Sequence, residues 1–171
     1  WLSTRSLHQW LRDEKIPGLY GIDTRALTKH LREKGSMLGK IYFESPEEVE
    51  FNDPNTENLI AKVSCPAPET HGEGEKTVVL VDCGTKFNII RCLTRRGVKV
   101  IRVPWDYDFN HLEFDGLFIS NGPGNPDFAG ATVENIRKAM ALCKPICGIC
   151  MGNQLLAKAA GASTYLSLIH I

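Results

Sequence analysis

The chain has 171 residues, with 20 basic and 20 acidic side chains, so its formal net charge is zero. This balance excludes the overall basic character of many nucleic-acid-binding proteins, and 43% apolar with 23% charged residues is typical of a globular protein. No apolar run approaches the roughly 18 residues that a membrane span needs, so a membrane is not an expected partner. Because of the charge balance, nucleic acid is not an expected partner either. The length predicts one domain, or one domain and part of another.

The first residues do not show where the protein is targeted. The chain starts at Trp1 without an initiator Met, a charged leader or a cleavable apolar core. Because it starts within a predicted helix, we expect it to be a fragment. Four of the six cysteines lie in apolar or strand-like contexts: Cys83, Cys92, Cys147 and Cys150. This usage predicts buried, reduced thiols in a reducing compartment.

Two helices are predicted near the start of the chain. Leucine and tryptophan at helical spacing predict an amphipathic helix over residues 3–15, which Pro17-Gly18 ends. Asp23 can cap a second helix by accepting hydrogen bonds from its first turn. That helix ends at Lys34, and Gly35 follows where a left-handed residue is favoured.

The second helix carries Leu27 and Leu31, which we expect to face inward. A strand is predicted over residues 37–43, and residues 58–63 form a short apolar segment. Residues 65–76 combine prolines, glycines and glutamates without periodicity. They predict a linker and a domain boundary.

After the linker the pattern alternates strands with helices. The first strand, over residues 78–81, is a continuous apolar run, as expected for a strand buried on both faces of a parallel sheet. The further predicted strands cover residues 98–103, 116–119 and 145–149, and the helices cover residues 88–96, 131–142 and 152–160. This alternation predicts an α/β fold with an open, mostly parallel sheet.

Two loops follow predicted strands, and ligands bind outside the carboxyl ends of strands in open α/β sheets. The first loop, residues 121–126, reads Asn-Gly-Pro-Gly-Asn-Pro. Its glycines permit close backbone approach and positive φ, so the loop can direct N–H groups at a developing oxyanion. Taken alone, the loop fits a tight surface turn at least as well.

The second loop has a strand–G-x-C-x-G–helix pattern with Cys150 at its centre. Gly148 and Gly152 flank the cysteine because the sharp turn leaves no room for a Cβ. Cys150 then lies at a helix N-terminus, where the dipole favours the nucleophilic thiolate. The N–H of Met151 points into the same space as an oxyanion donor. The alternative is a buried cysteine between two packing glycines.

Two other uses of these cysteines must be weighed. Cys147 and Cys150 have a redox spacing, and Cys143 extends it to a spacing found around iron–sulfur clusters. Cys147 belongs to the predicted strand, so we expect its side chain to point into the sheet packing, away from the elbow. A cluster also needs a flexible loop, which this stretch lacks, so no metal site is expected.

A nucleophilic cysteine needs a base, usually histidine. None of the five histidines is convincing in this role: His8 and His30 belong to the first helices, His71 to the linker, His111 to a loop and His170 to the tail. We therefore expect the catalytic partner to be missing from these 171 residues.

The two loops resemble those of class I glutamine amidotransferases, through residues 148–154 (Gly-Ile-Cys-Met-Gly-Asn-Gln) and residues 121–126. Residues 21–28 and 31–41 resemble the small-subunit N-terminal domain of carbamoyl-phosphate synthases, and residues 81–86 and 103–105 fit the same family. The resemblance runs from residue 1 to about residue 165.

The resemblance implies four parts. Residues 1–64 would be the C-terminal part of an α+β small-subunit N-terminal domain, and residues 65–76 a linker. Residues 77–165 would be the N-terminal half of the amidotransferase domain. Residues 166–171 do not look like the family's continuation, so we expect a tail that is not native.

The resemblance also implies a mechanism. Cys150 attacks the side-chain amide carbon of glutamine, and the backbone N–H groups of Met151 and Gly124 stabilise the oxyanion. Ammonia leaves, and water hydrolyses the glutamyl thioester. Glutamine would be bound by Gly122, Gly124, Met151 and Gln154.

The implied partner is a synthetase subunit, or a synthetase region of the same polypeptide. It would use ATP and Mg²⁺ to combine ammonia with bicarbonate, so no cofactor is expected in this segment. The family's His and Glu triad members would lie beyond residue 171, and a glutamine-contacting Ser before residue 1. We expect these residues alone to be inactive as a glutaminase.

Within the family, Asn153 stands where most relatives have His. With Asn125, Trp105 and residues 53–55, it resembles the mitochondrial, urea-cycle-type branch, which implies the mitochondrial matrix. The cytosolic pyrimidine-pathway branch is the alternative. Ammonia-using members of the mitochondrial branch lose the nucleophilic cysteine, whereas Cys150 is present here, so the parent is expected to use glutamine.

Two other functions stay open. One is a non-catalytic module that regulates or stabilises an ammonia-dependent synthase. The other is an unrelated cysteine hydrolase on the same sheet, which leaves residues 23–25 unexplained.

Overall fold

The computed structural model describes residues 3–35 and 37–165. Its helices are α1 (Leu7–Asp13), α2 (Thr24–Lys34), α3 (Leu59–Val63), α4 (Phe87–Thr94), α5 (Gly130–Met140) and α6 (Met151–Ala159). Its strands are β1 (Glu69–His71), β2 (Lys76–Asp82), β3 (Val98–Pro104), β4 (Gly116–Ile119) and β5 (Ile146–Gly148). Short 3-10 turns lie at Pro46–Glu48, Pro54–Thr56, Phe109–His111 and Pro126–Phe128.

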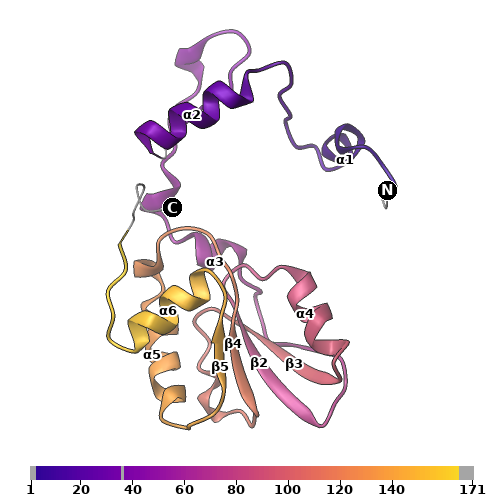
Figure 1. Ribbon diagram of the computed structural model, residues 1–171, viewed down its shortest axis with the longest axis vertical. Coiled ribbons are helices and arrows are strands. Elements are labelled where there is room, and N and C mark those ends of the chain that lie inside the picture. Colours follow the sequence, from indigo (N-terminus) through magenta and orange to yellow (C-terminus); the bar gives the residue numbers. More distant parts are fainter. Residues whose placement is uncertain (1–2, 36, 166–171) are drawn as a thin grey trace.

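The strands form one sheet in the order β1-β3-β2-β4-β5. All neighbours are parallel except β1, which is antiparallel to β3. Figure 1 shows α4 on one side of this sheet and α5 with α6 on the other. The prediction of an α/β fold with an open, mostly parallel sheet is therefore confirmed, with strand ends within two residues of those expected.

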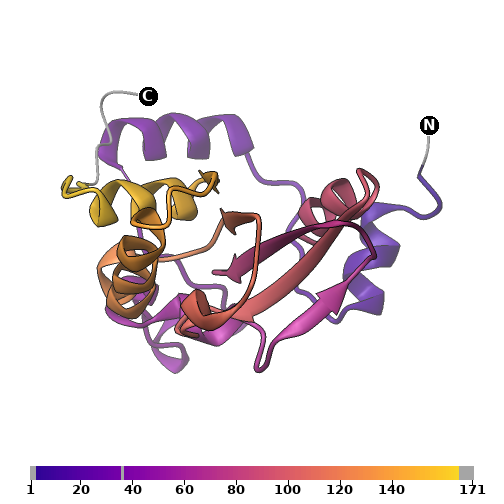
Figure 2. The same cartoon turned by 90° about the horizontal axis from the view of Figure 1, so that it is seen from below.

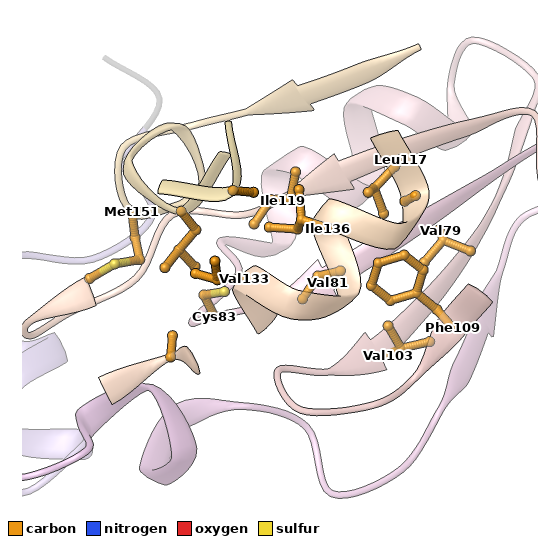
Figure 3. Packing of buried hydrophobic residues seen from close by; sticks show 14 of the residues in the cluster. Val79, Val81, Cys83, Val103, Phe109, Leu117, Ile119, Val133, Ile136 and Met151 are labelled. Carbon is orange, nitrogen blue, oxygen red and sulfur yellow. The ribbon is translucent and has the colours of Figure 1, made fainter. Parts of the chain in front are cut away.

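The apolar run of β2 lies at the centre of the sheet because both of its faces are covered. Val79 and Val81 belong to the larger buried cluster, with Leu117 and Ile119 of β4 and Ile136 of α5. Figure 3 shows these side chains between the sheet and the helices. Burial of aliphatic side chains at about 25 cal/mol per Å² of apolar surface makes this layer the main stabilising unit.

A smaller cluster fills the opposite face. Leu80, Ile90 and Val100 are its buried members, and Leu93 and Phe118 pack against it. Alternate residues of β2 thus contribute to different layers, as the period of two in a strand requires. Because α4 is the helix on this side, the cluster covers β2 and β3 better than it covers β5.

The predicted linker contains a strand. Within residues 65–76, β1 pairs with β3 through Thr70↔Ile101, and Cys65 is 5% exposed. β1 is an edge strand, and two of its three residues are exposed. Its residues are therefore polar, and the sequence shows no apolar pattern that would predict a strand. The limits of the domains stay a prediction.

The helix α2 begins and ends as predicted, but its apolar side chains are not buried. Asp23 accepts a hydrogen bond from the Ala26 N–H at 2.9 Å, and Gly35 has φ 85°, which confirms both ends of α2. The expected inward packing of Leu27 and Leu31 is wrong, since they are 48% and 39% exposed. Figures 1 and 2 show the reason: α2 lies outside the two layers that cover the sheet.

The strand expected over residues 37–43 is also wrong, because the structure assigns no strand there. An isolated strand is not stable without a partner, and none of the described segments pairs with it. The helix expected over residues 3–15 is shorter, with Ser6 capping α1 through the Gln9 N–H at 3.1 Å. The described helices include none long and apolar enough to cross a membrane.

Candidate active site

Cys150 forms a strained elbow between β5 and α6. Its backbone has φ 52° and ψ −110°, a conformation that costs a non-glycine residue about 1–3 kcal/mol. Its carbonyl accepts the N–H groups of Asn153 at 3.0 Å and Gln154 at 3.2 Å, which closes the first turn of α6. Cys150 is exposed. The sulfur is therefore open to solvent at a helix N-terminus, so the expected elbow is confirmed and the alternative of a buried cysteine is wrong.

The glycines around Cys150 are required by close packing. A Cβ on Gly148 would lie 2.5 Å from the carbonyl carbon and oxygen of Gly152. A Cβ on Gly152 would lie 2.2 Å from the carbonyl oxygen of Ile119. Both distances are far below van der Waals contact, so the elbow can form only with glycine at these two positions.

The two predicted loops lie at the same rim of the sheet. β4 and β5 are parallel neighbours, with Ile119 opposite Gly148, so their carboxyl ends are adjacent. The N–H of Gly152 donates to the Ser120 carbonyl at 3.0 Å, which joins the elbow directly to the start of the other loop. The expectation of a shared rim is confirmed.

Residues 121–126 combine close approach with ordinary turn chemistry. A Cβ on Gly122 would lie 2.2 Å from the Cys83 carbonyl oxygen, and Gly124 has φ 81°. Asn125 accepts the Asp127 N–H at 3.0 Å and so caps the 3-10 turn that follows. The glycine half of the loop thus packs tightly against the end of β2, while its second half is a surface turn.

Two predicted site residues belong to the first turn of α6. The Met151 side chain is 2% exposed and lies in the larger core cluster, so only its backbone can face the rim. As the first residue of the helix, Met151 has an N–H that no carbonyl within α6 can accept. Gln154 is exposed, one turn along the helix. These placements suit the predicted roles, which stay predictions.

The thiols differ in burial, and the prediction of four buried thiols is right only for Cys83. Burial, with a smaller effect from Asp82, raises the pKa of Cys83 to about 12. Cys92 is half-buried, whereas Cys147 and Cys150 are exposed. The expectation that Cys147 points into packed surroundings fails because β5 is the edge strand: Cys147 lies opposite Phe118, on the face where α4 covers β2 and β3.

No group of three or more His, Cys, Asp or Glu residues that could hold a metal ion is present within residues 3–35 and 37–165. Cys143, Cys147 and Cys150 are therefore not gathered around one point.

The described histidines form no hydrogen bond with the Cys150 elbow. His71 is on β1, at the opposite edge of the sheet from β5. His111 is 3.3 Å from the Tyr107 hydroxyl, and His8 is 3.1 Å from Arg12. None of the four in the described part of the chain, His30 included, hydrogen-bonds the Cys150 sulfur, and His170 lies outside that part.

One buried carboxylate at this rim was not expected from the sequence. Asp82, at the end of β2, is fully buried and accepts the N–H of Gly84 at 2.9 Å and of Thr85 at 2.7 Å on one oxygen. Its other oxygen accepts Nε and Nη2 of Arg102, at 2.9 and 2.5 Å, and the Cys65 N–H at 2.8 Å.

Burial by itself raises the pKa of the Asp82 carboxyl, but the backbone N–H groups of Thr85 and Gly84 lower it below its usual value. The available signal was an acidic residue between a buried strand and Cys83-Gly84. That signal alone does not show the role of Asp82, because its partners come from three separate segments.

Two protein-family models match different parts of the chain. Residues 79–169 match the family model for class-I glutamine amidotransferases. Residues 1–41 match the model for the carbamoyl-phosphate synthase small chain, CPSase domain. The first match covers most of β2, the strands β3, β4 and β5, both loops and the elbow.

Curated relatives match over nearly the whole chain. Human mitochondrial carbamoyl-phosphate synthase [ammonia] is 51% identical over 96% of this chain and 11% of its own length. The multifunctional protein CAD of Squalus acanthias is 49% identical over 96% of this chain and 8% of its own length. The chain thus spans about a tenth of the length of these relatives.

Among solved structures, a candidate GMP synthase component from Thermoplasma acidophilum is 34% identical, with a TM-score of 0.46, over 52% of this chain and 46% of that chain.

Proposed function

The chain belongs to the class-I glutamine amidotransferase family, in a form joined to a carbamoyl-phosphate synthase small-chain segment, and we propose that it is the glutamine-hydrolysing part of such a synthase. The observation that carries this proposal is the elbow. Cys150 is held in a strained conformation with its thiol exposed, next to a glycine loop at the carboxyl rim of the sheet.

In the proposed reaction the Cys150 sulfur attacks the side-chain amide carbon of glutamine, and a C–S bond forms. The N–H groups of Met151 and Gly124 stabilise the charge that develops on the amide oxygen. The C–N bond then breaks, the nitrogen takes up a proton and leaves as ammonia, and a glutamyl thioester remains. Water hydrolyses this thioester to glutamate and returns the thiol.

Glutamine is proposed to lie between the two loops. Gly122 and Gly124 would contact it through the backbone, and Gln154 through its side chain. No described histidine contacts Cys150, so the base that takes its proton is assigned to the parent protein outside the described residues. The ammonia would pass to a synthetase region, which uses ATP, Mg²⁺ and bicarbonate.

The alternative is a non-catalytic module in an ammonia-dependent synthase. It is favoured by the name of the human relative, which specifies ammonia. The same relative is named mitochondrial, and we propose the mitochondrial matrix for the parent protein, with the cytoplasm as the alternative. The two functions differ in what they require of Cys150, because only hydrolysis needs a thiol that recognises a glutamine-like ligand.

The test is chemical labelling of the full-length parent with a chloroketone analogue of glutamine. We expect Cys150 to be labelled stoichiometrically, at least about 100-fold faster than the other exposed thiols, because bound ligand is positioned at the sulfur. Cys143 is a matched internal control, since it is exposed and also has φ 52°. Free glutamine should protect Cys150 alone. Equal labelling rates at Cys143 and Cys150 would favour the non-catalytic module.

A further inference from the structure

Ser120 lies where the loops after three strands meet. It follows β4 directly and is fully buried. Its hydroxyl oxygen accepts the Cys83 N–H at 2.9 Å, from the loop after β2, and the hydroxyl donates to the Asn121 carbonyl at 2.8 Å. Its own carbonyl accepts the Gly152 N–H at 3.0 Å, from the elbow after β5. One small residue thus contacts all three loops.

Asn121 extends this connection. Its amide nitrogen donates to the Gly84 carbonyl at 2.9 Å, and its amide oxygen accepts the Lys86 N–H at 3.4 Å. Gly122 follows with no room for a Cβ against the Cys83 carbonyl. The start of the glycine loop is therefore held against residues 83–86 by hydrogen bonds and by packing.

The loop of residues 83–86 is itself held by the buried carboxylate of Asp82. Asp82 accepts the N–H groups of Gly84 and Thr85, and Arg102 holds the other carboxylate oxygen. Because the carboxylate and its partners are buried or half-buried, these bonds are protected from exchange with water. The glycine loop is thus held against a rigid neighbour, residues 83–86, partly through the side chain of Asn121.

We propose that Ser120 is a positioning residue of the glutamine site, and that with Asn121 it sets the distance between the oxyanion loop and the Cys150 elbow. This rests on the proposed function. Oxyanion donors act only when they are held about 2.7–3.1 Å from the developing charge, so a small shift of Gly124 relative to Met151 lowers the rate. Ser120→Ala frees the loop from Cys83 and leaves that buried N–H without a partner.

The test compares Ser120→Ala with Thr132→Val in the full-length parent protein. Thr132 is a matched control because it is also fully buried, and its hydroxyl donates to the Trp105 carbonyl, outside the three loops. Cys150 labelling is timed with the chloroketone glutamine analogue and, separately, with iodoacetamide, which needs no glutamine site. Synthesis from free ammonia reports whether the rest of the protein is intact.

We expect Ser120→Ala to lower the chloroketone rate about 10- to 100-fold, while the iodoacetamide rate and the ammonia-dependent activity stay within about twofold. With glutamine, kcat should fall more than KM rises. Thr132→Val should keep the wild-type ratio of the two labelling rates. If Ser120→Ala keeps that ratio as well, or Thr132→Val loses it equally, the positioning role is overturned.

A second variant covers the case in which Ser120→Ala does not fold. Asn121→Asp is nearly isosteric and sits in a partly exposed position, but it replaces the donor to the Gly84 carbonyl with an oxygen. The same selective loss supports the proposal, and an unchanged ratio overturns it. If the wild type shows no preference for the chloroketone, the proposed function fails and the inference falls with it.

Discussion

At the scale of single residues, Asp82 shows how a buried charge is stabilised at the rim. The carboxylate is fully buried, yet it accepts hydrogen bonds from three backbone N–H groups, and one of its oxygens also accepts from both Nε and Nη2 of Arg102. Arg102 also donates to Glu69 of β1 at 3.0 Å. Breaking a buried pair leaves an uncompensated charge, which usually costs about 3–5 kcal/mol.

This network predicts a specific pH dependence. Because the folded state lowers the pKa of Asp82, its contribution is complete above the unfolded value of about 4 and is lost as the pH falls through the folded value. The free energy of unfolding should therefore fall on acidification below about pH 4. Asp82→Asn should cost about 3–5 kcal/mol at pH 7 and show a shallower acid dependence.

Urea denaturation between pH 2 and pH 7 measures both effects. Asp13→Asn is the control, because Asp13 pairs with Arg5 on the surface at 3.0 Å and should change stability by at most about 0.5 kcal/mol. An Asp82→Asn protein with wild-type stability and acid dependence would show that the network contributes nothing.

At the scale of elements, the close approach of α6 to β4 decides the elbow. The first turn of α6 packs so near the end of β4 that Gly152 has no space for a methyl group. This contact brings the N–H groups at the helix start to the carboxyl ends of the strands, where the two loops meet. The glycine pattern around Cys150 is thus a packing requirement between elements.

We expect Gly152→Ala to destabilise the protein by about 3 kcal/mol, because the new Cβ would lie 2.2 Å from the Ile119 carbonyl oxygen. Gly130→Ala is the matched control: Gly130 begins α5, and a Cβ there meets nothing within 4 Å. It should be neutral or stabilising by up to about 1 kcal/mol. Equal urea midpoints for the two variants would contradict this account of the elbow.

At the scale of the whole molecule, stability is unevenly distributed. In the described part of the chain, the buried hydrophobic residues begin at Ile60 and continue through the sheet and its helices. Large apolar side chains before that point, such as Tyr20 at 96% and Phe43 at 97%, are exposed. Figure 1 shows α1 and α2 extending away from the sheet. The N-terminal segment should therefore open more easily than the sheet.

Limited trypsin digestion of this chain tests the difference. We expect the first cuts at lysines and arginines between residues 3 and 58, while Lys99 and Arg102 of β3 stay protected, because cleavage requires local unfolding. Mass mapping of the earliest fragments identifies the sites. First cuts inside β3, or uniform cutting along the chain, would contradict the uneven distribution.

Much of the sheet and the elbow could be predicted because their signals are local. A continuous apolar run identifies β2, and glycines at fixed distances from Cys150 identify a sharp turn before a helix. Asp23 and Gly35 likewise act on residues within one helical turn. Each pattern depends on neighbours only a few positions away, so the sequence shows it directly.

Other features depend on partners distant in the chain. The polar strand β1 exists because its edge pairs with β3, about 30 residues further on. Asp82 acquires its role from Cys65 and Arg102, and the exposure of Cys147 from the edge position of β5. Leu27 and Leu31 have helical apolar spacing, but the described residues leave both side chains largely exposed. Periodicity shows which side of an element is apolar, not what will cover it.

The zero net charge and ordinary composition excluded whole classes of protein. The residue pattern was enough to identify the α/β class, the alternation of strands and helices from β2 to α6, and Cys150 as the candidate nucleophile. The folded structure was needed to show that Ser120, Asn121 and residues 83–86 join the glycine loop to the elbow. The physical reason is the distance along the chain between the residues that interact. Turns, caps and strand runs arise from local sterics and backbone hydrogen bonds, whereas the alignment of a site arises from buried contacts between segments that only folding brings together.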